Sequence, residues 1–156
     1  MTEIEVRAAR PEDVPGLVGS SAALFAEDAG QRDPTMNLNW PHEHGTQRFT
    51  ETINDPNHLV LVAIADNQVI GHLTATLGAP TTKRPVRVAT LASLYVQPTS
   101  RGSGTAANLV ATFRTWAREH QADLLAVTAY ATNDRAIRFY QRQGFTPAAL
   151  TLETTP

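Results

Sequence analysis

The sequence contains no cysteine, so it can form neither a disulfide bond nor a thiolate metal site. It has no apolar run close to the ~20 residues that span a bilayer, and residues 1–7 lack the apolar stretch of a signal peptide. Neither charge is in large excess: 13 basic and 15 acidic residues give a net charge of −2, whereas nucleic-acid-binding proteins usually carry a basic face. We therefore expect a soluble, cytoplasmic protein that binds neither nucleic acid nor membranes.

The residues that are present indicate one globular domain. A chain of 156 residues has the usual size of a single domain, and a hydrophobic content of 42% is enough for a core. The sequence shows no repeat, no linker and no low-complexity segment. We therefore expect residues 1–156 to fold as a single domain.

Alternating and helical patterns of apolar residues predict an α/β fold with a mixed sheet. We expect strands at about 4–7, 59–64, 69–77, 86–96, 124–130 and 145–152, and helices at about 11–25, 43–53, 104–120 and 133–143. The order is then strand, two helices, three strands, helix, strand, helix, strand. Asp66-Asn67 is typical of a tight hairpin turn, and Asn133 is a good N-cap for the helix at 133–143. The last two helices are single-helix crossovers, which implies that some neighbouring strands are parallel.

The segment from Arg101 to Ala106 is the clearest candidate for a binding site. It reads Arg-Gly-Ser-Gly-Thr-Ala, and it lies between a predicted strand and the clearest predicted helix. The first amides of a helix have no partners within the helix, and the helix dipole adds positive charge there. Gly102 and Gly104 let the backbone approach an anion closely, and Arg101 adds a cation. This arrangement predicts a phosphate or pyrophosphate site.

Two well-known phosphate-binding patterns fit this segment less well. A P-loop requires a lysine after its last glycine, and none is present here. The dinucleotide fingerprint G-x-G-x-x-G/A matches Gly102, Gly104 and Ala107, but four residues separate the preceding strand from the first glycine. The next predicted strand also ends without the acidic residue that would bind a ribose.

Two motifs in the second half of the chain resemble a known family. Arg101, Gly104 and Ala106 match the Q/R-x-x-G-x-G/A signature of the GNAT superfamily of N-acetyltransferases, and residues 94–98 resemble that family's preceding strand. Residues 133–145 resemble the family's N-x-x-A-x-x-F-Y-x-x-x-G-F segment. The predicted order of elements is also the family's order. The resemblance covers about residues 91–145 by motif and the whole chain by topology.

The resemblance implies an acyltransferase that moves the acetyl group of acetyl-CoA, its co-substrate, directly onto an amine. In this family two neighbouring parallel strands part and hold the pantetheine arm between them. Tyr140 occupies the position of the usual proton donor to the leaving thiolate, and a phenol with a pKa of about 10 suits a thiol with a pKa of about 8.5. The family implies no metal. The residues that it implies bind the coenzyme are Tyr95, Val96, Arg101, Gly102, Ser103, Gly104, Thr105, Ala106, Ala107 and Asn133.

The general base is the point at which the chain departs from many members of the family. Those members carry a glutamate on the fourth strand, whereas residues 86–96 contain no carboxylate. Glu27, Asp28 and His72 remain candidates, together with a chain of water molecules or an amine that binds already deprotonated. A lone histidine on a strand is more often structural, which is the interpretation we favour for His72.

The region between residues 21 and 58 usually shapes the acceptor pocket in this fold. Its six acidic and two basic residues give a local charge of −4, which favours a small cationic amine. Glu27 and Asp28 would bind this acceptor and Trp40 would supply an apolar wall, although the acids would equally suit an ordinary solvated surface. His42 and His44 face apart on a helix, so no metal site is predicted there.

Two other functions stay open at this point. A non-catalytic relative that binds acyl-CoA as a sensor would explain the missing glutamate, whereas the retained Tyr140 argues against it. A protein N-acetyltransferase would need an open groove, and the loop at 27–41 could decide between a groove and a pocket. An apolar edge at 145–152 would also suit pairing into a homodimer.

Overall fold

A five-stranded mixed sheet separates two layers of helices in the computed structural model, which describes residues 3–156. The strands lie in the order β1-β2-β3-β4-β5; the first four are antiparallel neighbours, and β5 runs parallel to β4. This parallel pair confirms the crossover expected from the sequence. The strand bounds are β1 (Glu5–Ala8), β2 (His58–Ala65), β3 (Gln68–Gly78), β4 (Val88–Val96) and β5 (Leu124–Val127).

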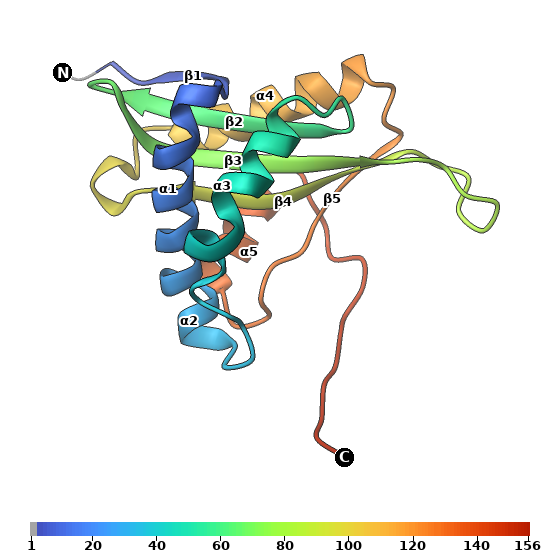
Figure 1. Ribbon diagram of the computed structural model, residues 1–156. Coiled ribbons are helices and arrows are strands. Elements are labelled where there is room, and N and C mark those ends of the chain that lie inside the picture. The colour runs from blue at the N-terminus through green and yellow to red at the C-terminus, as the bar shows by residue number, and fades with distance from the viewer. Residues whose placement is uncertain (1–2) are drawn as a thin grey trace.

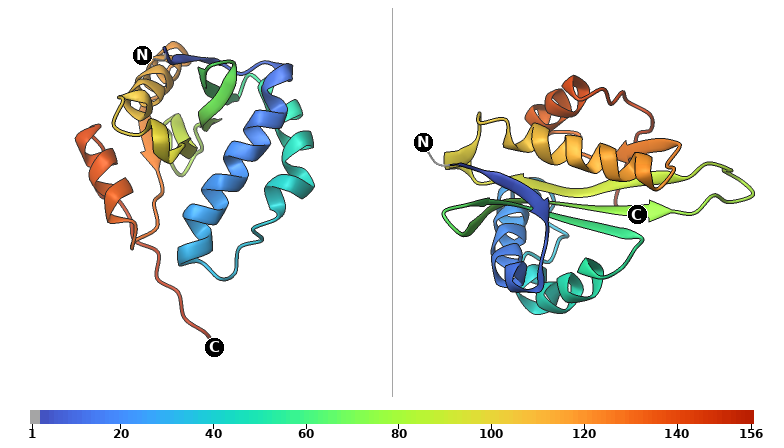
Figure 2. Two further views of the ribbon diagram at one scale, coloured as in Figure 1. Left: turned by 90° about the vertical axis from the view of Figure 1, so that its left-hand side faces the viewer. Right: turned by 90° about the horizontal axis from the view of Figure 1, so that it is seen from above.

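The helices cover the two faces of this sheet unequally. Helices α1 and α3 pack on one face, mainly over β2, β3 and β4, while α4 and α5 lie on the other (Figures 1 and 2). The four-residue α2 falls inside the segment that we expected to be a loop, and α3 begins three residues before its predicted start. The helix bounds are α1 (Val14–Glu27), α2 (Ala29–Arg32), α3 (Trp40–Ile53), α4 (Thr105–Glu119) and α5 (Asp134–Arg142).

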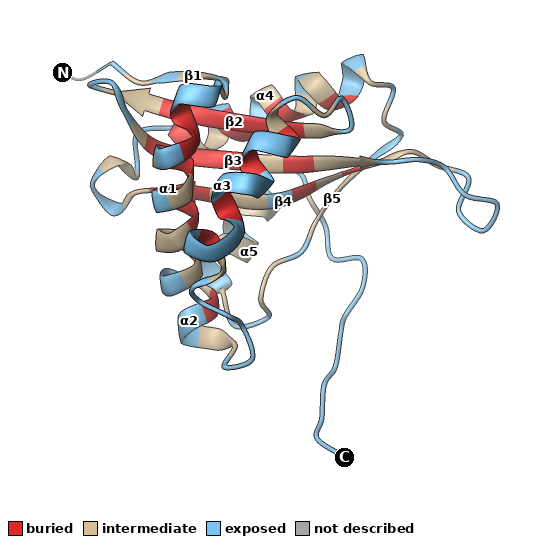
Figure 3. Cartoon of the chain, in the orientation of Figure 1, coloured by how far each residue is buried: buried red, intermediate tan, exposed pale blue. Residues whose placement is uncertain are grey.

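The core lies against the middle strands, where both faces of the sheet are covered. Leu61 and Ala63 of β2 belong to the cluster under α4, and Val60 and Val62 to the cluster under α1 and α3. All four are buried, which explains why β2 reads as a continuous apolar run (Figure 3).

The hairpin between β2 and β3 forms as the sequence predicts. Asp66 and Asn67 have φ angles of 50° and 60°, in the left-handed region that a type I′ turn requires at both central residues. Aspartate and asparagine enter this region more readily than most residues. The turn fixes the register of the hairpin, in which Ala65 pairs with Gln68.

The prediction of a sixth strand at residues 145–152 is wrong. The segment has no strand pairing, and every residue from Thr146 to Pro156 is exposed. A strand is stable only when its backbone groups pair with a neighbour. The segment instead runs away from the body of the molecule (Figure 1), and it meets no neighbouring strand there.

Candidate functional site

A cleft of about 510 Å³ opens where β4 and β5 part. Its walls are residues 91–96 of β4, the turn from Ser100 to Ala107, residues 127–129 at the end of β5, and α5. The C-terminal end of α1 closes one side. The cleft therefore joins the two segments that carry the family motifs, which are far apart in the sequence.

A bulge in β4 separates the two strands at the cleft. Leu91 pairs with Val127 as the last pair between β4 and β5, and Ala92 has no partner in the β3–β4 register. An extra residue on one strand bends it and disrupts the local pairing. The remainder of β4 therefore presents an unpaired edge to the cleft.

The free backbone groups on this edge are the N–H and the carbonyl of Leu94 and the N–H of Val96, because the carbonyl oxygen of Val96 accepts a hydrogen bond from Arg101. The N–H of Gln97 donates to the carbonyl oxygen of Ile70 at 2.8 Å, so the groups of Gln97 face β3. Successive residues of an antiparallel strand alternate between facing and not facing one neighbour. The backbone of Tyr95 therefore also faces β3. From the sequence we expected Tyr95 to bind the coenzyme and did not expect this of Leu94. Only the register with β3 shows which backbone groups face the gap between β4 and β5.

The turn before α4 carries a row of unpaired amides. Between Gly102 and Ala107 no backbone N–H donates a hydrogen bond to any residue that the structure describes; the first to do so is that of Asn108, to the oxygen of Gly104 at 3.0 Å. All of these residues except Ser103 line the cleft. Six adjacent unpaired amides at the positive end of a helix favour the binding of an anion.

Two glycines give this turn its shape. Gly102 and Gly104 have φ angles of 81° and 83°, which residues with a side chain rarely adopt. A Cβ at either position would meet no atom within 4 Å, so the requirement for glycine is conformational rather than steric. The Ser103 hydroxyl donates to the carbonyl oxygen of Ser100 at 2.6 Å and braces the turn.

Gly104→Ala is expected to lower the free energy of unfolding by about 1–2 kcal/mol, because alanine is strained in the left-handed region. Gly19→Ala is the matched control, since Gly19 is exposed within α1 and a Cβ there would also meet no atom within 4 Å. It should raise stability by about 0.5–1 kcal/mol through helix propensity. Urea denaturation of both variants measures the difference; equal effects would show that the turn does not depend on glycine.

Arg101 is held at the mouth of the cleft by three contacts. Its Nε donates to the carbonyl oxygen of Val96 at 2.8 Å, and its terminal nitrogen forms an ion pair with Glu27 at 2.6 Å. The guanidinium lies 5.6 Å from the centre of the Tyr95 ring, within the range of a cation–π interaction. Arg101 is thus a positioned cation beside the unpaired amides.

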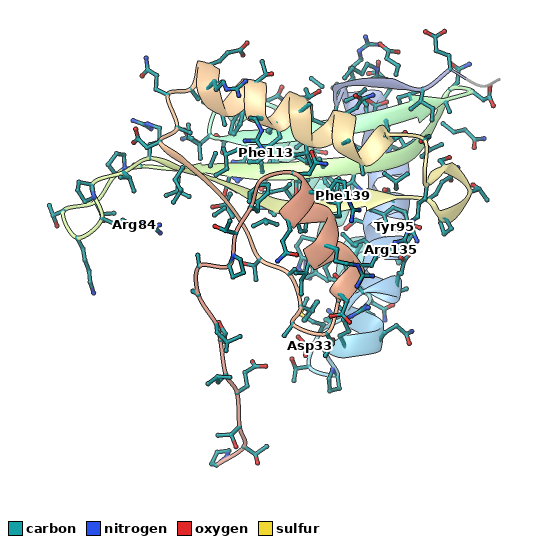
Figure 4. All side chains as sticks on the ribbon, turned by 180° about the vertical axis from the view of Figure 1, so that it is seen from behind. Asp33, Arg84, Tyr95, Phe113, Arg135 and Phe139 are labelled. Atoms are coloured by element: carbon teal, nitrogen blue, oxygen red, sulfur yellow. The ribbon has the colours of Figure 1, made fainter. Side chains whose placement is uncertain are left out.

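Three further arginines line the cleft, and the sequence analysis missed them. Arg32 comes from α2, whereas Arg135 and Arg142 come from the two ends of α5. With Arg101 they place four positive charges against the two negative charges of Glu27 and Asp28, a net of +2. Arg135 lies with Tyr95 and Phe139 around α5 and the end of β4 (Figure 4). The cleft therefore favours a polyanion.

Tyr140 lies in the same cleft, on α5. It packs edge-on against Phe139 and Phe145, with ring centroids 5.4 Å and 5.8 Å away. Burial, and secondarily the negative charge of Asp28, raises the pKa of Tyr140 to about 12. The sequence analysis assumed a pKa near the ordinary value, so the phenol is a weaker acid than expected and stays protonated at neutral pH.

Asn133 connects the two walls of the cleft. Its Oδ1 accepts a hydrogen bond from the Ala136 N–H at 3.1 Å, which confirms the predicted helix cap of α5. Its Nδ2 donates to Asp28 at 3.0 Å, and Asp28 also pairs with Arg32 at 3.1 Å. The side-chain amide of Asn133 therefore ties α5 to the end of α1.

The local excess of acidic residues does not gather at the cleft. Of the six acids between residues 21 and 58, only Glu27 and Asp28 line it, and both are paired with arginine. Trp40 does not line it either: its ring stacks on Phe25 with the centroids 6.1 Å apart and the planes at 7°. Sequence position alone could not show this, because the other four acids lie in α3 or just after α2 and α3, away from the cleft.

The comparisons with known proteins agree with this geometry. The model of the Acetyltransferase (GNAT) family matches residues 28–145, which is most of the chain. The chain belongs to this family. A curated relative, an uncharacterized N-acetyltransferase of Mycobacterium tuberculosis, is 31% identical over 98 residues. That match covers 63% of this chain and 59% of the relative, so the chain spans less than two thirds of the relative's length.

Solved acetyltransferases share the GNAT fold over nearly the whole chain. The aminoglycoside N-acetyltransferase AAC(6')-Iy in complex with CoA has a TM-score of 0.75 at 17% identity, with 100% of this chain and 96% of that chain covered. A predicted acetyltransferase with acetyl-CoA from Clostridium acetobutylicum has a TM-score of 0.77 at 20% identity, with 98% and 96% covered. At these identities the likeness concerns the fold.

His72, a candidate base in this GNAT chain, lies inside the protein and not in the cleft. It is wholly buried, its Nδ1 lies 2.6 Å from the Ser20 hydroxyl, and its Nε2 lies 3.2 Å from that of Ser93. Burial lowers the pKa of His72 to about 4, so the ring is neutral at pH 7. Ser93 also lies 2.5 Å from the Thr74 hydroxyl and itself lines the cleft. His72 therefore orders polar groups behind the cleft wall.

Two kinds of site are not found in the described part of the chain. Residues 3–156 contain no group of three or more histidine, aspartate or glutamate side chains that could hold a metal ion. Over the same residues, no helix combines the length and the apolar content needed to cross a membrane.

Proposed function

We propose that this GNAT chain is an acetyl-CoA-dependent N-acetyltransferase that acetylates a primary amine of a small, cationic molecule by direct attack. One observation carries the proposal: six unpaired amides lead into a cleft that also contains the free edge of β4 and the Tyr140 hydroxyl. The proposal treats residues 1–156 as one domain. The family supports the reaction type, and the cleft supports the co-substrate.

The residues of the cleft fit the coenzyme along its whole length. The amides of Gly102 to Ala107 would bind the pyrophosphate, with Arg101 as a cation beside it. Arg135 and Arg142 would attract its remaining negative charge. The N–H and carbonyl of Leu94 and the N–H of Val96 would pair with the amides of the pantetheine arm, as a sheet edge pairs with an added strand.

Bound acetyl-CoA supplies an activated thioester, and the chain supplies the groups around it. The acceptor nitrogen forms a bond to the acetyl carbon, the carbon–sulfur bond breaks, and the amine loses one proton. A backbone N–H on the free edge of β4 would donate to the carbonyl oxygen as it becomes negative. The Tyr140 hydroxyl would donate to the sulfur as the thiolate leaves.

No side chain of the cleft is arranged as a dedicated base. Glu27 and Asp28 are the only carboxylates that line the cleft among the described residues, and each is engaged by an arginine. His72 is buried behind the wall and its pKa is about 4. In this proposal the acceptor loses its first proton before it reaches the thioester, so the attacking amine is neutral. After the attack the nitrogen loses one more proton, which passes to water.

The proposed acceptor class rests on Glu27 and Asp28. They lie at the side of the cleft closed by α1 and would attract a cationic molecule. The fold neighbours include the aminoglycoside 6'-N-acetyltransferase AAC(6')-Ih from Acinetobacter baumannii, with a TM-score of 0.76 at 19% identity. The name of that enzyme gives aminoglycosides as its substrates, and an aminoglycoside is a small molecule that carries several amino groups.

The release of free thiol from acetyl-CoA tests the proposal against a panel of polyamines, aminoglycosides, amino-acid derivatives and neutral amines. Turnover should be fastest with a cationic member. Glu27→Gln should raise the KM of that acceptor by about two- to fivefold, because an interaction between partly exposed charges contributes up to about 1 kcal/mol. Glu119→Gln, at the exposed end of α4, is the control and should leave KM unchanged. Coenzyme binding without turnover on any amine would favour a sensor, and turnover only with peptides would favour a protein acetyltransferase.

A further inference from the structure

Four polar side chains form a hydrogen-bonded cluster behind the wall of the cleft, and the proposed reaction does not use it. They are Ser20 of α1, His72 and Thr74 of β3, and Ser93 of β4. Ser20 and His72 are buried, whereas Thr74 and Ser93 are half-buried. Of the four, Ser93 alone lines the cleft. The cluster therefore connects a buried imidazole to a hydroxyl that a bound molecule would reach.

The hydrogen bonds of the cluster fix the direction in which His72 donates. A neutral imidazole has one nitrogen that donates and one that accepts. Among the described residues the Ser20 hydroxyl has no partner except Nδ1 of His72, at 2.6 Å. If Nδ1 carried the hydrogen, the buried hydrogen of Ser20 would have no acceptor, which is costly. Ser20 therefore donates to Nδ1, and the Nε2–H of His72 donates to Ser93 at 3.2 Å.

The packing around His72 holds the ring in one orientation. Phe49 of α3 meets it edge-on, with the centroids 6.5 Å apart and the planes at 79°. The Tyr95 ring lies on β4 with its centroid also 6.5 Å away. A side chain that is locked by packing and by two hydrogen bonds positions its partner precisely. His72 thus holds the Ser93 hydroxyl at a fixed place on the cleft wall.

The Ser93 oxygen keeps one lone pair free for a molecule in the cleft. A hydroxyl has one hydrogen to donate and two lone pairs that accept. One lone pair accepts from His72, and the hydrogen has an acceptor in Thr74 Oγ1 at 2.5 Å. The second lone pair has no donor among the described residues. The N–H of an amine is a donor that fits it.

Ser93 lies where the acceptor would meet the thioester. It follows the bulge at Ala92 and precedes Leu94, whose N–H faces the cleft. Its contacts place its side chain on the face of the sheet that α1 covers (Figure 1). Glu27 and Asp28, which are proposed to attract the acceptor, line the cleft from the end of the same helix. An acceptor held there would present its amine on the Ser93 side of the thioester.

We propose that the Ser93 hydroxyl accepts a hydrogen bond from the attacking amine, and that His72 is the positioning residue that holds Ser93 for this contact. The role rests on the proposed acetyl transfer. As the nitrogen–carbon bond forms, the nitrogen becomes positively charged, and its hydrogen bond to Ser93 becomes stronger. An interaction that strengthens in the transition state raises kcat. The carbon–sulfur bond then breaks, the nitrogen loses its proton to water, and Ser93 keeps its own hydrogen.

Three variants of β4 test the contact by the release of free thiol from acetyl-CoA. The acceptor is whichever polyamine, aminoglycoside or amino-acid derivative the wild type turns over fastest. Ser93→Ala should lower kcat by about 10- to 100-fold and change the KM of the acceptor by less than about twofold. Ser93→Thr keeps a hydroxyl and should retain most of the wild-type kcat. Thr90→Val removes a hydroxyl from the same strand outside the cleft and should have no effect.

The outcomes separate this role from the proposed function. Turnover by the wild type with an unchanged kcat in Ser93→Ala would overturn the role of Ser93 and leave the acetyl transfer standing. No turnover of any amine by the wild type would overturn the proposed function, and the role of Ser93 with it. Thermal unfolding should show that each variant folds.

A double-mutant cycle tests whether His72 acts through Ser93. His72→Gln should lower kcat by about 2- to 10-fold in the wild type, the effect of one misplaced neutral hydrogen bond, and should cause no further loss in Ser93→Ala. A structural role would give the same loss in both backgrounds and would overturn the positioning role. Nitrogen-15 NMR of the wild type should show the hydrogen of His72 on Nε2, and a hydrogen on Nδ1 would also overturn it.

Discussion

Tyr140→Phe is expected to lower kcat by about 10²-fold, with little change in the affinity for acetyl-CoA. The phenol lies in the cleft, and among the described residues no group accepts a hydrogen bond from its hydroxyl. Removing a hydrogen bond to a charged group costs about 1.5–3 kcal/mol, and positioned proton donors contribute about 10²–10⁴-fold. Because the leaving thiolate develops only during the reaction, the loss should fall on kcat and not on binding.

The pKa of Tyr140, about 12, refines this role. Transfer of its proton to a thiolate whose thiol has a pKa of about 8.5 is uphill by more than 3 units, or roughly 5 kcal/mol. The hydroxyl therefore acts mainly as a hydrogen-bond donor that stabilises the leaving group. It also stays protonated, so kcat should show no loss from its ionisation as the pH rises from 7 to 10.

Steady-state kinetics with a saturating amine checks the prediction, with Tyr130→Phe as the control. Tyr130 donates to Asp33 at 3.3 Å and does not line the cleft, so its removal should change kcat by less than about twofold. If Tyr140→Phe kept the wild-type kcat, Tyr140 would be a packing residue only.

Acidification from pH 7 to pH 4 is expected to lower the free energy of unfolding by about 3 kcal/mol more in the wild type than in His72→Gln. The pKa of His72 is about 4 in the folded protein and about 6.5 in the unfolded chain. The unfolded chain therefore binds more protons between these values. The stability that the neutral ring contributes is complete above pH 6.5 and is lost as the pH falls toward 4.

Urea denaturation followed by tryptophan fluorescence at several pH values measures this difference. Glutamine can still hydrogen-bond toward Ser20 and Ser93, and the carboxylates that also titrate in this range are common to both proteins. His42→Gln, at an exposed position of α3, should keep the wild-type slope. Parallel slopes for wild type and His72→Gln would show that the imidazole does not titrate on unfolding.

Features that depend on local sequence could be predicted from the chain alone. The Asp66-Asn67 turn, the cap at Asn133 and the glycine-rich start of α4 each follow from a few adjacent residues. The parallel pairing of β4 with β5 followed from the single-helix crossover between them. The family followed from two motifs, and the structure brings both motifs to one cleft.

Features that depend on the tertiary arrangement could not be predicted. Residues 145–152 have a strand-like composition, but pairing requires a neighbouring edge, and this chain does not place one beside them. Leu94 was not predicted to face the cleft, because only the register with β3 shows the direction of its backbone groups. Arg142 was missed because its position matters only once α5 is packed beside β4.

Calorimetric titration with acetyl-CoA tests the central claim most directly, because the unpaired amides before α4 are proposed to bind its pyrophosphate. We expect one site per chain with a dissociation constant between about 1 μM and 1 mM, the usual range of substrate affinities. S-acetylpantetheine, which lacks the pyrophosphate and the nucleotide, should bind at least about 100-fold more weakly, because charge-assisted hydrogen bonds are lost. Equal affinity for the two compounds, or no binding of acetyl-CoA at millimolar concentration, would show that the amides before α4 do not bind the pyrophosphate.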